Sequence, residues 1–337
     1  MTMSSSEPAS STMTQKRSRA FAWALHQSRT SPTRSSLWCW SPHSLTSSEQ
    51  ALNALKSLFW SSRPISWVNT AVPFAAAYYF AGGDVAAELI VLSFFFLIPY
   101  NFLMYGINDV FDYESDLRNP RKGGIEGALL APELHRTTLL WAFGFSVPFL
   151  GYAVFVSLEN LPALLVLLLT VFAVIAYSVK GLRFKEIPFL DSVTSSVHFV
   201  GPMLFGLLLA GDSFGSTLQL ATLAFFLWGA GSHAFGAVQD IRADREAGIA
   251  SVATNLGARN TVRIAVVLYL VAGVLLLALP DRFWQASFAA IPYLIVVGSQ
   301  LGITDETCEE ANRGWKRFLL LNFLAGAWIM ALLIGPS

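Results

Sequence analysis

Long apolar stretches separated by polar breaks cover the chain from about residue 64 to its C-terminal end. A helix needs roughly 20 predominantly apolar residues to cross the hydrocarbon core of a bilayer, and the stretches are close to that length. The pattern predicts nine spans, at 64–81, 86–107, 137–157, 160–179, 188–210, 218–239, 262–279, 284–302 and 318–334. We therefore expect an all-α polytopic membrane protein, a bundle of about nine transmembrane helices.

The composition agrees with a lipid bilayer as the surroundings. Of 337 residues, 54% are hydrophobic and only 13% are charged, whereas soluble domains carry about 25% charged residues. Basic and acidic residues both number 22, and this balance indicates no nucleic-acid partner. Cys39 and Cys308 lie in unlike segments without a CxxC partner, which argues against a disulfide framework and a zinc site. The sequence gives no indication of the oligomeric state.

The first 50 residues differ from the rest of the chain. They are rich in Ser and Thr, carry scattered Lys and Arg residues, and show no sustained apolar period. We interpret 1–50 as a disordered N-terminal tail and 51–337 as the transmembrane domain. The apolar run at 20–25 is shorter than the core of a signal peptide, which needs about 7–15 residues. A translation start placed too far upstream would give the same pattern.

Basic residues are distributed unevenly among the predicted loops. Loops after the even-numbered spans, together with Arg263 at the start of the seventh span, contain 14 Lys and Arg residues, whereas loops after the odd-numbered spans contain only Arg282. Cytoplasmic loops are enriched in these residues. The bias predicts a multi-pass plasma-membrane protein with a cytoplasmic N-terminus and a C-terminus outside the cell.

Two acidic motifs follow the second and the sixth predicted span. The first contains Asp109, Asp112 and Asp116, and the second contains Asp240 and Asp244. Spacings of three, four and seven residues place carboxylates on one face of a helix, where their oxygens can converge on a hard cation such as Mg²⁺. The two motifs recur four spans apart, which indicates a duplicated unit. We expect both motifs at the cytoplasmic end, where they would hold Mg²⁺ and a diphosphate.

Cationic residues near these motifs are candidates for binding the diphosphate. Lys180 and Arg183 lie in the loop between the two motifs, and Arg121 and Lys122 follow the first motif. Guanidinium and ammonium groups can bind the phosphate oxygens that a metal leaves unpaired. The alternative is that the carboxylates are solvated helix ends and that the basic loops only reflect membrane orientation.

Several polar residues within or beside the spans have two interpretations. Asn69 and Asn108 can each offer an amide to the diphosphate, or Asn69 can join helices through a hydrogen bond. His233 lies two helical turns before Asp240 on the same face, which favours a position in a reaction cavity. Phe94 to Phe96 we interpret as apolar bulk that faces lipid.

The motifs resemble those of the UbiA superfamily of intramembrane prenyltransferases. The sequence NDVFDYESD at 108–116 matches the family's first motif, NDxxDxxxD, and DIRADREAG at 240–248 matches the second, DxxxD. The segment 177–185 is similar to the family's loop between helices four and five, and the resemblance covers about 56–335. It implies a nine-helix bundle, Mg²⁺ as cofactor, an isoprenyl diphosphate donor and an apolar acceptor within the bundle. It also implies metal binding by Asp109, Asp112, Asp116, Asp240 and Asp244.

One departure from the family pattern points to an acceptor. Members that use aromatic acceptors usually continue the first motif with an Arg-Pro-Leu-type segment, whereas this chain has NPRKGGIEGA at 119–128. That stretch resembles the lycopene elongase branch, which implies dimethylallyl diphosphate as donor and lycopene as acceptor. An alkene is then the nucleophile, so a polar group has only to position water or accept a proton. His233 and Tyr177 are the candidates for that role.

Two other functions remain open on the sequence. A UbiA-type enzyme that acts on an aromatic, quinone-precursor or tetrapyrrole acceptor would keep the same diphosphate site and differ only in its acceptor pocket. A membrane transporter would also use carboxylates within a membrane protein, but its binding site is expected near the midplane. Release of pyrophosphate from an allylic diphosphate in the presence of Mg²⁺ distinguishes an enzyme from a carrier.

Overall fold

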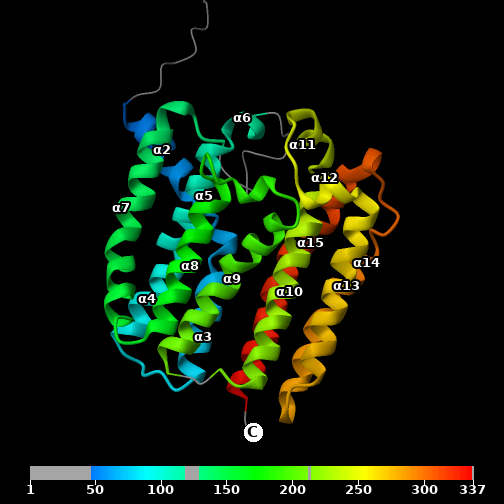
Figure 1. Ribbon diagram of the computed structural model, residues 1–337. Helices are drawn as coiled ribbons and strands as arrows, with labels where there is room; N and C mark the ends of the chain where they lie inside the picture. The colour runs from blue at the N-terminus through cyan, green and yellow to red at the C-terminus, as the bar shows by residue number, and fades with distance from the viewer. Residues whose placement is uncertain (1–46, 118–128, 212–213, 336–337) are drawn as a thin grey trace, which may run out of the picture. The chain divides into compact units, whose positions relative to one another are not determined.

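The computed structural model describes residues 47–117, 129–211 and 214–335, and all secondary structure in this part of the chain is helical (Figure 1). The helices, with η for 3-10 helices, are α2 (Ser47–Ser61), η1 (Pro64–Ser66), α3 (Val68–Phe80), α4 (Ala87–Leu97), α5 (Pro99–Phe111), α6 (Tyr113–Asp116), α7 (Pro132–Val156), α8 (Leu161–Ser178), η2 (Phe184–Glu186), α9 (Leu190–Leu209), α10 (Ser216–Val238), α11 (Ile241–Ala247), α12 (Val252–Leu256), α13 (Ala258–Leu277), η3 (Asp281–Ala289), α14 (Ala290–Gly298), η4 (Asp305–Glu310) and α15 (Ala311–Ile334). The predicted all-α fold is confirmed.

Seven helices of the described chain are long and apolar enough to cross a membrane. They comprise α4 joined to α5, then α7, α8, α9, α10, α13, and η4 joined to α15. The other two predicted spans, 64–81 and 284–302, fall on shorter elements. Helix α3 has 13 residues, and the second span is divided between η3 and α14. At 1.5 Å per residue, 13 helical residues extend over only about 20 Å.

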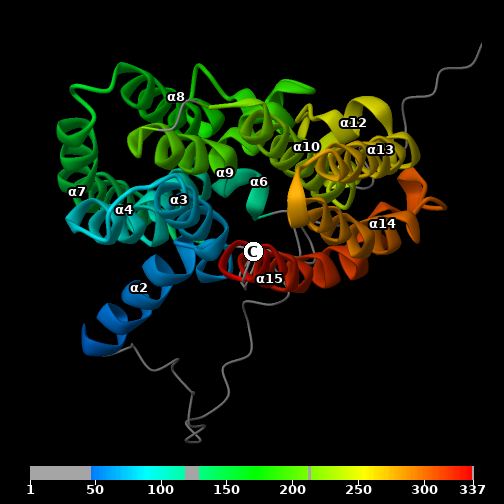
Figure 2. The same cartoon turned by 90° about the horizontal axis from the view of Figure 1, so that it is seen from below.

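Four helices pack in a closed succession: α3 on α9, α9 on α10, α10 on α15, and α15 on α3. Figure 2 shows these helices nearly end-on, with α6 visible between them. In Figure 1 the first described helix, α2, lies at the end of the bundle that also carries α6 and α11, and α15 finishes at the opposite end. The first and the last described helices thus lie at opposite ends of the bundle.

Helix α2 was not expected from the sequence. It begins at Ser47, inside the stretch interpreted as a tail, and residues 1–46 of that stretch lie outside the described residues. Leu52, Leu55 and Phe59 are exposed on it, whereas Leu58 packs against the hydrophobic core. The helix is short and mostly exposed, so it lacks the continuous apolar length by which a span is recognised.

The predicted break between the third and fourth spans is built by a polar residue. The Asn160 side chain accepts a hydrogen bond from the Ala163 amide at 3.1 Å and so caps the start of α8. Its amide nitrogen donates to the Leu208 carbonyl at 2.6 Å. One side chain thus provides hydrogen-bond partners for backbone groups at the start of α8 and at the end of α9.

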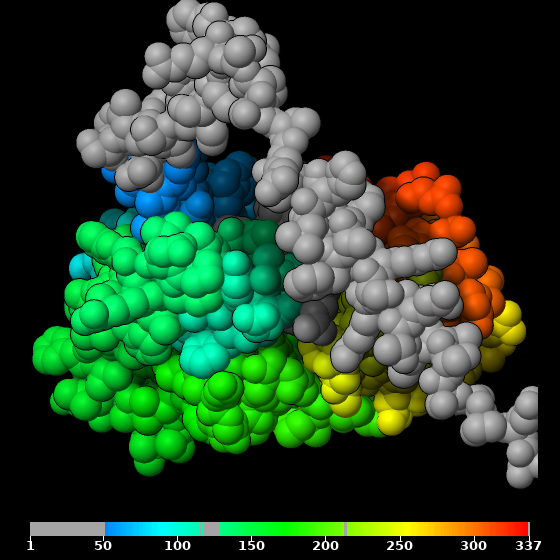
Figure 3. Space-filling view, turned by 90° about the horizontal axis from the view of Figure 1, so that it is seen from above, coloured from blue at the N-terminus to red at the C-terminus, as the bar shows by residue number. Residues whose placement is uncertain are grey.

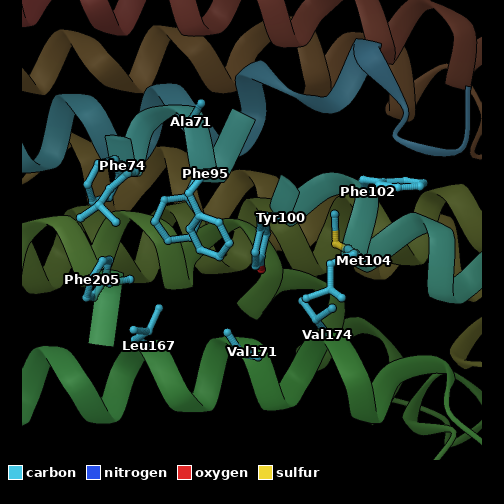
Figure 4. Packing of buried hydrophobic residues seen from close by; sticks show 14 of the residues in the cluster. Ala71, Phe74, Phe95, Tyr100, Phe102, Met104, Leu167, Val171, Val174 and Phe205 are labelled. Carbon is cyan, nitrogen blue, oxygen red and sulfur yellow. The ribbon is translucent and has the colours of Figure 1, made fainter. Parts of the chain in front are cut away.

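The first hydrophobic cluster joins α3, α4, α5, α8 and α9 (Figure 4). Phe95 and Phe96 are fully buried in it, and only Phe94 of that run is partly exposed, at 37%. The interpretation of Phe94 to Phe96 as lipid-facing bulk is therefore wrong for two of the three residues. A run of apolar residues has no polar position to mark its outer face, so sequence alone does not tell core from lipid.

Close packing of α9 depends on small residues. A Cβ atom at Gly206 would lie 2.7 Å from the backbone oxygen of Phe74, so α3 and α9 can approach only because position 206 is glycine. The second cluster packs α10, α13, α14 and α15 around Tyr269 and Tyr293. The candidate site is lined from both sides, by α3, α5 and α9 and by α10 and α15.

Candidate active site

The first acidic motif spans a break between two helices. Helix α5 ends at Phe111, Asp112 is its C-cap with φ −100° and ψ −1°, and the four-residue α6 follows. Asp109 therefore lies on α5, whereas Asp116 lies on α6. The expectation that the three carboxylates share one face of a continuous helix is wrong, because the chain turns at Asp112.

The second acidic motif repeats this local geometry. Helix α10 ends at Val238, and Asp240 precedes α11 with φ −100° and ψ −5°, nearly the values of Asp112. The Asp244 amide donates to the Asp240 carbonyl at 2.8 Å, just as the Asp116 amide donates to that of Asp112 at 2.8 Å. Helices α5 and α10 thus end in the same turn, each with an Asp at the turn and another four residues later.

The repetition extends to two arginine residues, one before α3 and one before α9. Arg63 precedes η1 and α3, and Arg183 precedes η2 and α9. Both have left-handed backbone conformations, with φ 50° at Arg63 and φ 42° at Arg183. A non-glycine residue in this region is strained, and such strain is concentrated at functional sites. These features agree with the duplicated unit indicated by the sequence.

Both motifs line a single cavity of about 360 Å³. Asp112 and Asp116 reach it from the first motif, and Asp240 and Asp244 reach it from the second. Figure 3 looks onto the end of the bundle where α6 and α11 lie, with α7 and α8 in green on one side and the region of η4 in orange on the other. Carboxylates that are more than 120 positions apart in sequence thus converge on one volume.

Asp109 lies deeper than the other carboxylates and is paired with Arg63. Its side chain is fully buried, and its Oδ1 lies 2.7 Å from Nη2 of Arg63. The guanidinium also lies over the Tyr105 ring, 4.8 Å from the ring centroid. Burial opposes the charge on Arg63, but Asp109, Tyr105 and Asp116 together favour it, so the pKa of Arg63 is raised. The sequence interpretation gave Arg63 no role in the site.

Two cations of the loop after α8 face the first motif. Lys185 lines the cavity and pairs with Oδ1 of Asp112, and Nη2 of Arg183 lies 3.9 Å from the same oxygen. Arg183 also pairs with Glu186. Burial lowers the pKa of Lys185 to about 8, although the nearby Glu186 favours its charged form. The cavity mouth thus presents cations and carboxylates together.

The other residues predicted to bind the diphosphate do not all line the cavity. Asn69 and Asn108 line the cavity, and Asn108 donates a hydrogen bond to Asp112. Lys180 is exposed and is not among the described residues that line the cavity. Arg121 and Lys122 lie outside the described residues.

Tyr177 and His233 line the cavity and form a hydrogen-bonded trio with Ser192. The Tyr177 hydroxyl is 2.8 Å from Nε2 of His233, and the Ser192 hydroxyl is 3.1 Å from its Nδ1. Both ring nitrogens of His233 are therefore engaged, one as donor and one as acceptor. His198 lies beside Tyr177, with ring centroids 5.2 Å apart, and also lines the cavity.

Asp191 has a structural role. It is completely buried and accepts hydrogen bonds from the amides of Ser192 and Val252, both at 2.7 Å. It thereby fixes the start of α12 against the start of α9. Asp191, Ser195 and His198 are spaced along one face of α9, and of these only Ser195 and His198 line the cavity.

The oxygen ligands of the two motifs fit Mg²⁺. Carboxylates are the hard donors that this cation prefers, and four of them, from Asp112, Asp116, Asp240 and Asp244, line the cavity. No three His, Cys, Asp or Glu side chains of the described chain form a metal-binding group by themselves. Mg²⁺ usually binds through one or two carboxylates together with substrate phosphates and water. The arrangement therefore suits a cation shared with a diphosphate.

Away from the carboxylates the cavity becomes aromatic and apolar. Its wall there comes from α9, α10 and α15, and includes Phe199, Trp228, Phe318 and Leu319. Ser195 and Ser232 add hydroxyl groups to this wall. The cavity thus has a charged end and an apolar end, which suits a substrate with a diphosphate head and a second, apolar reactant.

Comparison with known proteins identifies the family. The model of the UbiA prenyltransferase family matches residues 70–326. The chain belongs to the UbiA prenyltransferase family. It is therefore an enzyme, a prenyltransferase with a polytopic all-α fold, as predicted. The alternative of a membrane transporter is not retained.

Two relatives are similar over most of the chain. The chain is 55% identical over 275 residues to the C(50) beta-cyclic carotenoids biosynthesis protein LbtBC of Dietzia sp., and it spans 63% of that protein's length. It is 50% identical over 285 residues to the lycopene elongase/hydratase of Corynebacterium glutamicum, covering 84% of this chain and 98% of that protein.

Solved structures of the UbiA family share the fold. A UbiA homolog from Archaeoglobus fulgidus bound to DMAPP and Mg²⁺ superposes with a TM-score of 0.60 and 19% identity, over 80% of this chain and 99% of that chain. The apo structure of a UbiA homolog from Aeropyrum pernix K1 gives a TM-score of 0.59 at 17% identity, with the same coverage.

Proposed function

We propose that this UbiA prenyltransferase transfers the dimethylallyl group of dimethylallyl diphosphate to lycopene, with Mg²⁺, to form a C45 and then a C50 carotenoid. One observation carries the proposal: a single cavity holds four carboxylates at one end and an aromatic wall at the other. The lycopene elongase/hydratase that the chain matches over 98% of its length supports the choice of acceptor. The DMAPP and Mg²⁺ bound by the Archaeoglobus fulgidus homolog support the choice of donor and cation.

The charged end of the cavity is suited to the donor head group. Asp112, Asp116, Asp240 and Asp244 would hold Mg²⁺, which neutralises the diphosphate and makes it a better leaving group. Lys185 lines the same end and would bind phosphate oxygens that the cation leaves free. Arg63 and Asp109 form the floor beneath them.

The reaction needs no strong base at its first step. The bond between the allylic carbon and the diphosphate oxygen breaks, and its electron pair leaves with the diphosphate. The π electrons of the terminal double bond of lycopene then form the new carbon–carbon bond to the allylic cation. The resulting tertiary cation either adds water and releases a proton, or loses a proton directly to give an alkene.

His233 and Tyr177 are placed to serve this last step. They are joined by a 2.8 Å hydrogen bond and lie between the carboxylates and the aromatic wall. The Ser192 hydroxyl contacts the second ring nitrogen and can donate or accept, so a proton accepted at one nitrogen of His233 can be released from the other. The pair would orient a water molecule or receive the released proton.

We further propose that the carboxylate end faces the cytoplasm, where diphosphates and Mg²⁺ are available, and that the C-terminus lies outside the plasma membrane. The excess of basic residues in the loops at this end supports that orientation. A reporter fused after Ser337 should be active only outside the cell, and activity inside would refute the orientation.

Pigment analysis in a host that accumulates lycopene tests the proposed acceptor. Expression of the full chain should convert lycopene to more polar or longer acyclic carotenoids, identified by mass as C45 and C50 products. The Asp240→Asn variant, expressed to the same level, should leave lycopene unchanged. Unchanged lycopene with the wild type, together with prenylation of an aromatic or quinone precursor, would show that the acceptor belongs to the other class.

A further inference from the structure

Four aromatic rings from two helices form a stacked series along the cavity. Phe225 and Trp228 of α10 stack with centroids 5.4 Å apart and planes at 18°, and Trp228 stacks on Phe318 of α15 at 6.1 Å and 20°. Phe318 in turn stacks on Trp315 at 4.8 Å and 11°. Trp228, Phe318 and Trp315 line the cavity. We call these four residues the aromatic ladder.

The upper end of the ladder lies close to the second acidic motif. A Cβ atom at Gly236 would lie 3.0 Å from the Trp315 ring, so glycine at this position lets the ring lie against α10. Gly236 is one helical turn before Asp240, which lines the charged end of the cavity. The ladder therefore begins where the donor head group would be held.

The ladder extends further than the donor needs. Trp228 precedes Asp240 by 12 residues, which corresponds to about 18 Å along a helix that rises 1.5 Å per residue. A five-carbon donor group is only a few bonds long and would occupy the end of the cavity beside Asp240. Most of the aromatic wall is thus available to the second substrate.

The ladder also has a defined shape. Its ring planes lie within 20° of one another at each step, so the rings form a regular series along this part of the cavity wall. Aromatic rings contact flat π systems favourably in offset or edge geometry. A rigid, planar polyene matches an ordered aromatic wall with little loss of conformational freedom, whereas a flexible saturated or skipped-alkene chain must be ordered.

We propose that the aromatic ladder is the binding platform for a rigid conjugated polyene acceptor and directs its terminal double bond toward Asp240. This inference rests on the proposed function and adds the residues that select the acceptor. The ladder would favour a conjugated hydrocarbon over a flexible isoprenoid hydrocarbon of similar size. The donor head group depends mainly on the charged end of the cavity, and only the upper end of the ladder adjoins it.

Steady-state kinetics of the full chain in lipid nanodiscs test the ladder. Phe318→Leu and Trp315→Leu keep an apolar side chain but remove a ring, and should raise the KM for lycopene about tenfold, the scale of losing an aromatic contact. The KM for dimethylallyl diphosphate should stay within about twofold of the wild type, because the carboxylates and Lys185 at the charged end of the cavity are unchanged. Trp315→Phe should restore most of the affinity for lycopene.

The matched control is Trp328→Leu, on the same helix. Trp328 stacks obliquely on Phe288 and lies in a separate groove with Leu324 and Pro292, away from the cavity. This variant should retain the wild-type KM for lycopene. If it raised that KM as much as Trp315→Leu does, the effect would belong to general packing of α15 and the ladder would be refuted.

Binding of lycopene and of squalene, without donor or Mg²⁺, provides a measurement independent of turnover. The wild type should bind lycopene more tightly than squalene, and Phe318→Leu should remove most of this preference. If the leucine variants do not fold, Gly236→Ala keeps all four rings and displaces Trp315, and it should also raise the KM for lycopene. An unchanged KM in folded variants that still make C45 product would refute the ladder alone. A wild type that converts an aromatic acceptor and leaves lycopene untouched would refute the proposed function.

Discussion

Arg63 and Asp109 form a buried ion pair beneath the two acidic motifs, with 2.7 Å between Nη2 and Oδ1. The pair connects the start of the first half of the bundle to the first motif, because Arg63 precedes η1 and Asp109 lies on α5. A buried charge is tolerated only with its partner, so each residue keeps the other in place. The pair thereby supports the floor of the site while the other carboxylates face the cavity.

Removal of the cation from this pair should be costly. Arg63→Met leaves the Asp109 carboxylate buried without a counter-charge, and we expect a loss of about 3–5 kcal/mol in the free energy of unfolding. Arg63→Lys keeps the charge but not the planar guanidinium over Tyr105, and should lose less. Thermal unfolding of both variants in one detergent measures the difference. Equal stability of Arg63→Met and the wild type would contradict the pairing.

The carboxylates of the two motifs should be required for turnover but not for folding. Asp112→Asn and Asp240→Asn each remove one ligand for the shared cation and should lower kcat/KM by about 10² or more, the scale of losing electrostatic stabilisation of developing charge. The control is Asp84→Asn, because Asp84 is exposed in the connection between α3 and α4. Near-normal turnover by Asp112→Asn at saturating Mg²⁺ would remove Asp112 from the cation site.

Helix α11 carries Asp244 and is held from its outer side. Arg245 donates to Asp305 at 2.7 Å, and the other Asp305 oxygen accepts from the Ala258 amide at 2.6 Å. Since Ile241 is the one buried residue of α11, these polar contacts determine where the helix lies. Asp305→Ala should cost about 1 kcal/mol in stability through the lost cap and raise the donor KM several-fold.

Arg242→Ala is the control for this contact. Arg242 pairs with Glu309 at 3.1 Å, but both side chains are more than half exposed, and exposed pairs contribute about 0–1 kcal/mol. Donor KM should therefore be unchanged in this variant. Asp305→Asn keeps an oxygen that can accept from the Ala258 amide but loses the charge. It therefore distinguishes the contribution of the cap from that of the ion pair with Arg245. A donor KM unaffected by Asp305→Ala would show that α11 needs no such support.

Helix packing around Gly206 gives a prediction about the fold itself. Gly206→Ala places a Cβ 2.7 Å from the Phe74 backbone oxygen, which forces α3 and α9 apart and should destabilise by about 1–3 kcal/mol. Gly144→Ala on α7 meets no atom within 4 Å and should be neutral or stabilise by up to about 1 kcal/mol. The unfolding temperature of Gly206→Ala should fall, whereas that of Gly144→Ala should stay unchanged or rise. Equal unfolding temperatures would contradict the close contact at Gly206.

Most of the fold follows from apolar length, and the exceptions have physical causes. Spans such as 137–157 and 188–210 are recognisable because they carry enough apolar residues to cross a bilayer. Helix α3 and the pair η3 and α14 are shorter than that length, and tertiary contacts hold them in the bundle. Burial of Phe95 and Phe96 was not predicted, because lipid and protein core select the same residue types.

The site was predictable to the extent that its residues carry a local pattern. The spacings of Asp112 with Asp116 and of Asp240 with Asp244 indicated the acidic motifs, and the structure brings these residues to one cavity. Arg63 has no such pattern, because its partner is 46 positions away. The aromatic ladder likewise joins α10 to α15 and exists only in three dimensions.

Product formation by the purified protein tests the central claim most directly. Full-length protein in nanodiscs would be incubated with Mg²⁺, lycopene and isotope-labelled dimethylallyl diphosphate, with Asp240→Asn as the matched inactive variant. The account predicts label first in a C45 and then in a C50 carotenoid, release of one pyrophosphate for each group added, and neither product with the variant. Lycopene recovered without label, while an aromatic or quinone precursor becomes labelled in the same membranes, would contradict it.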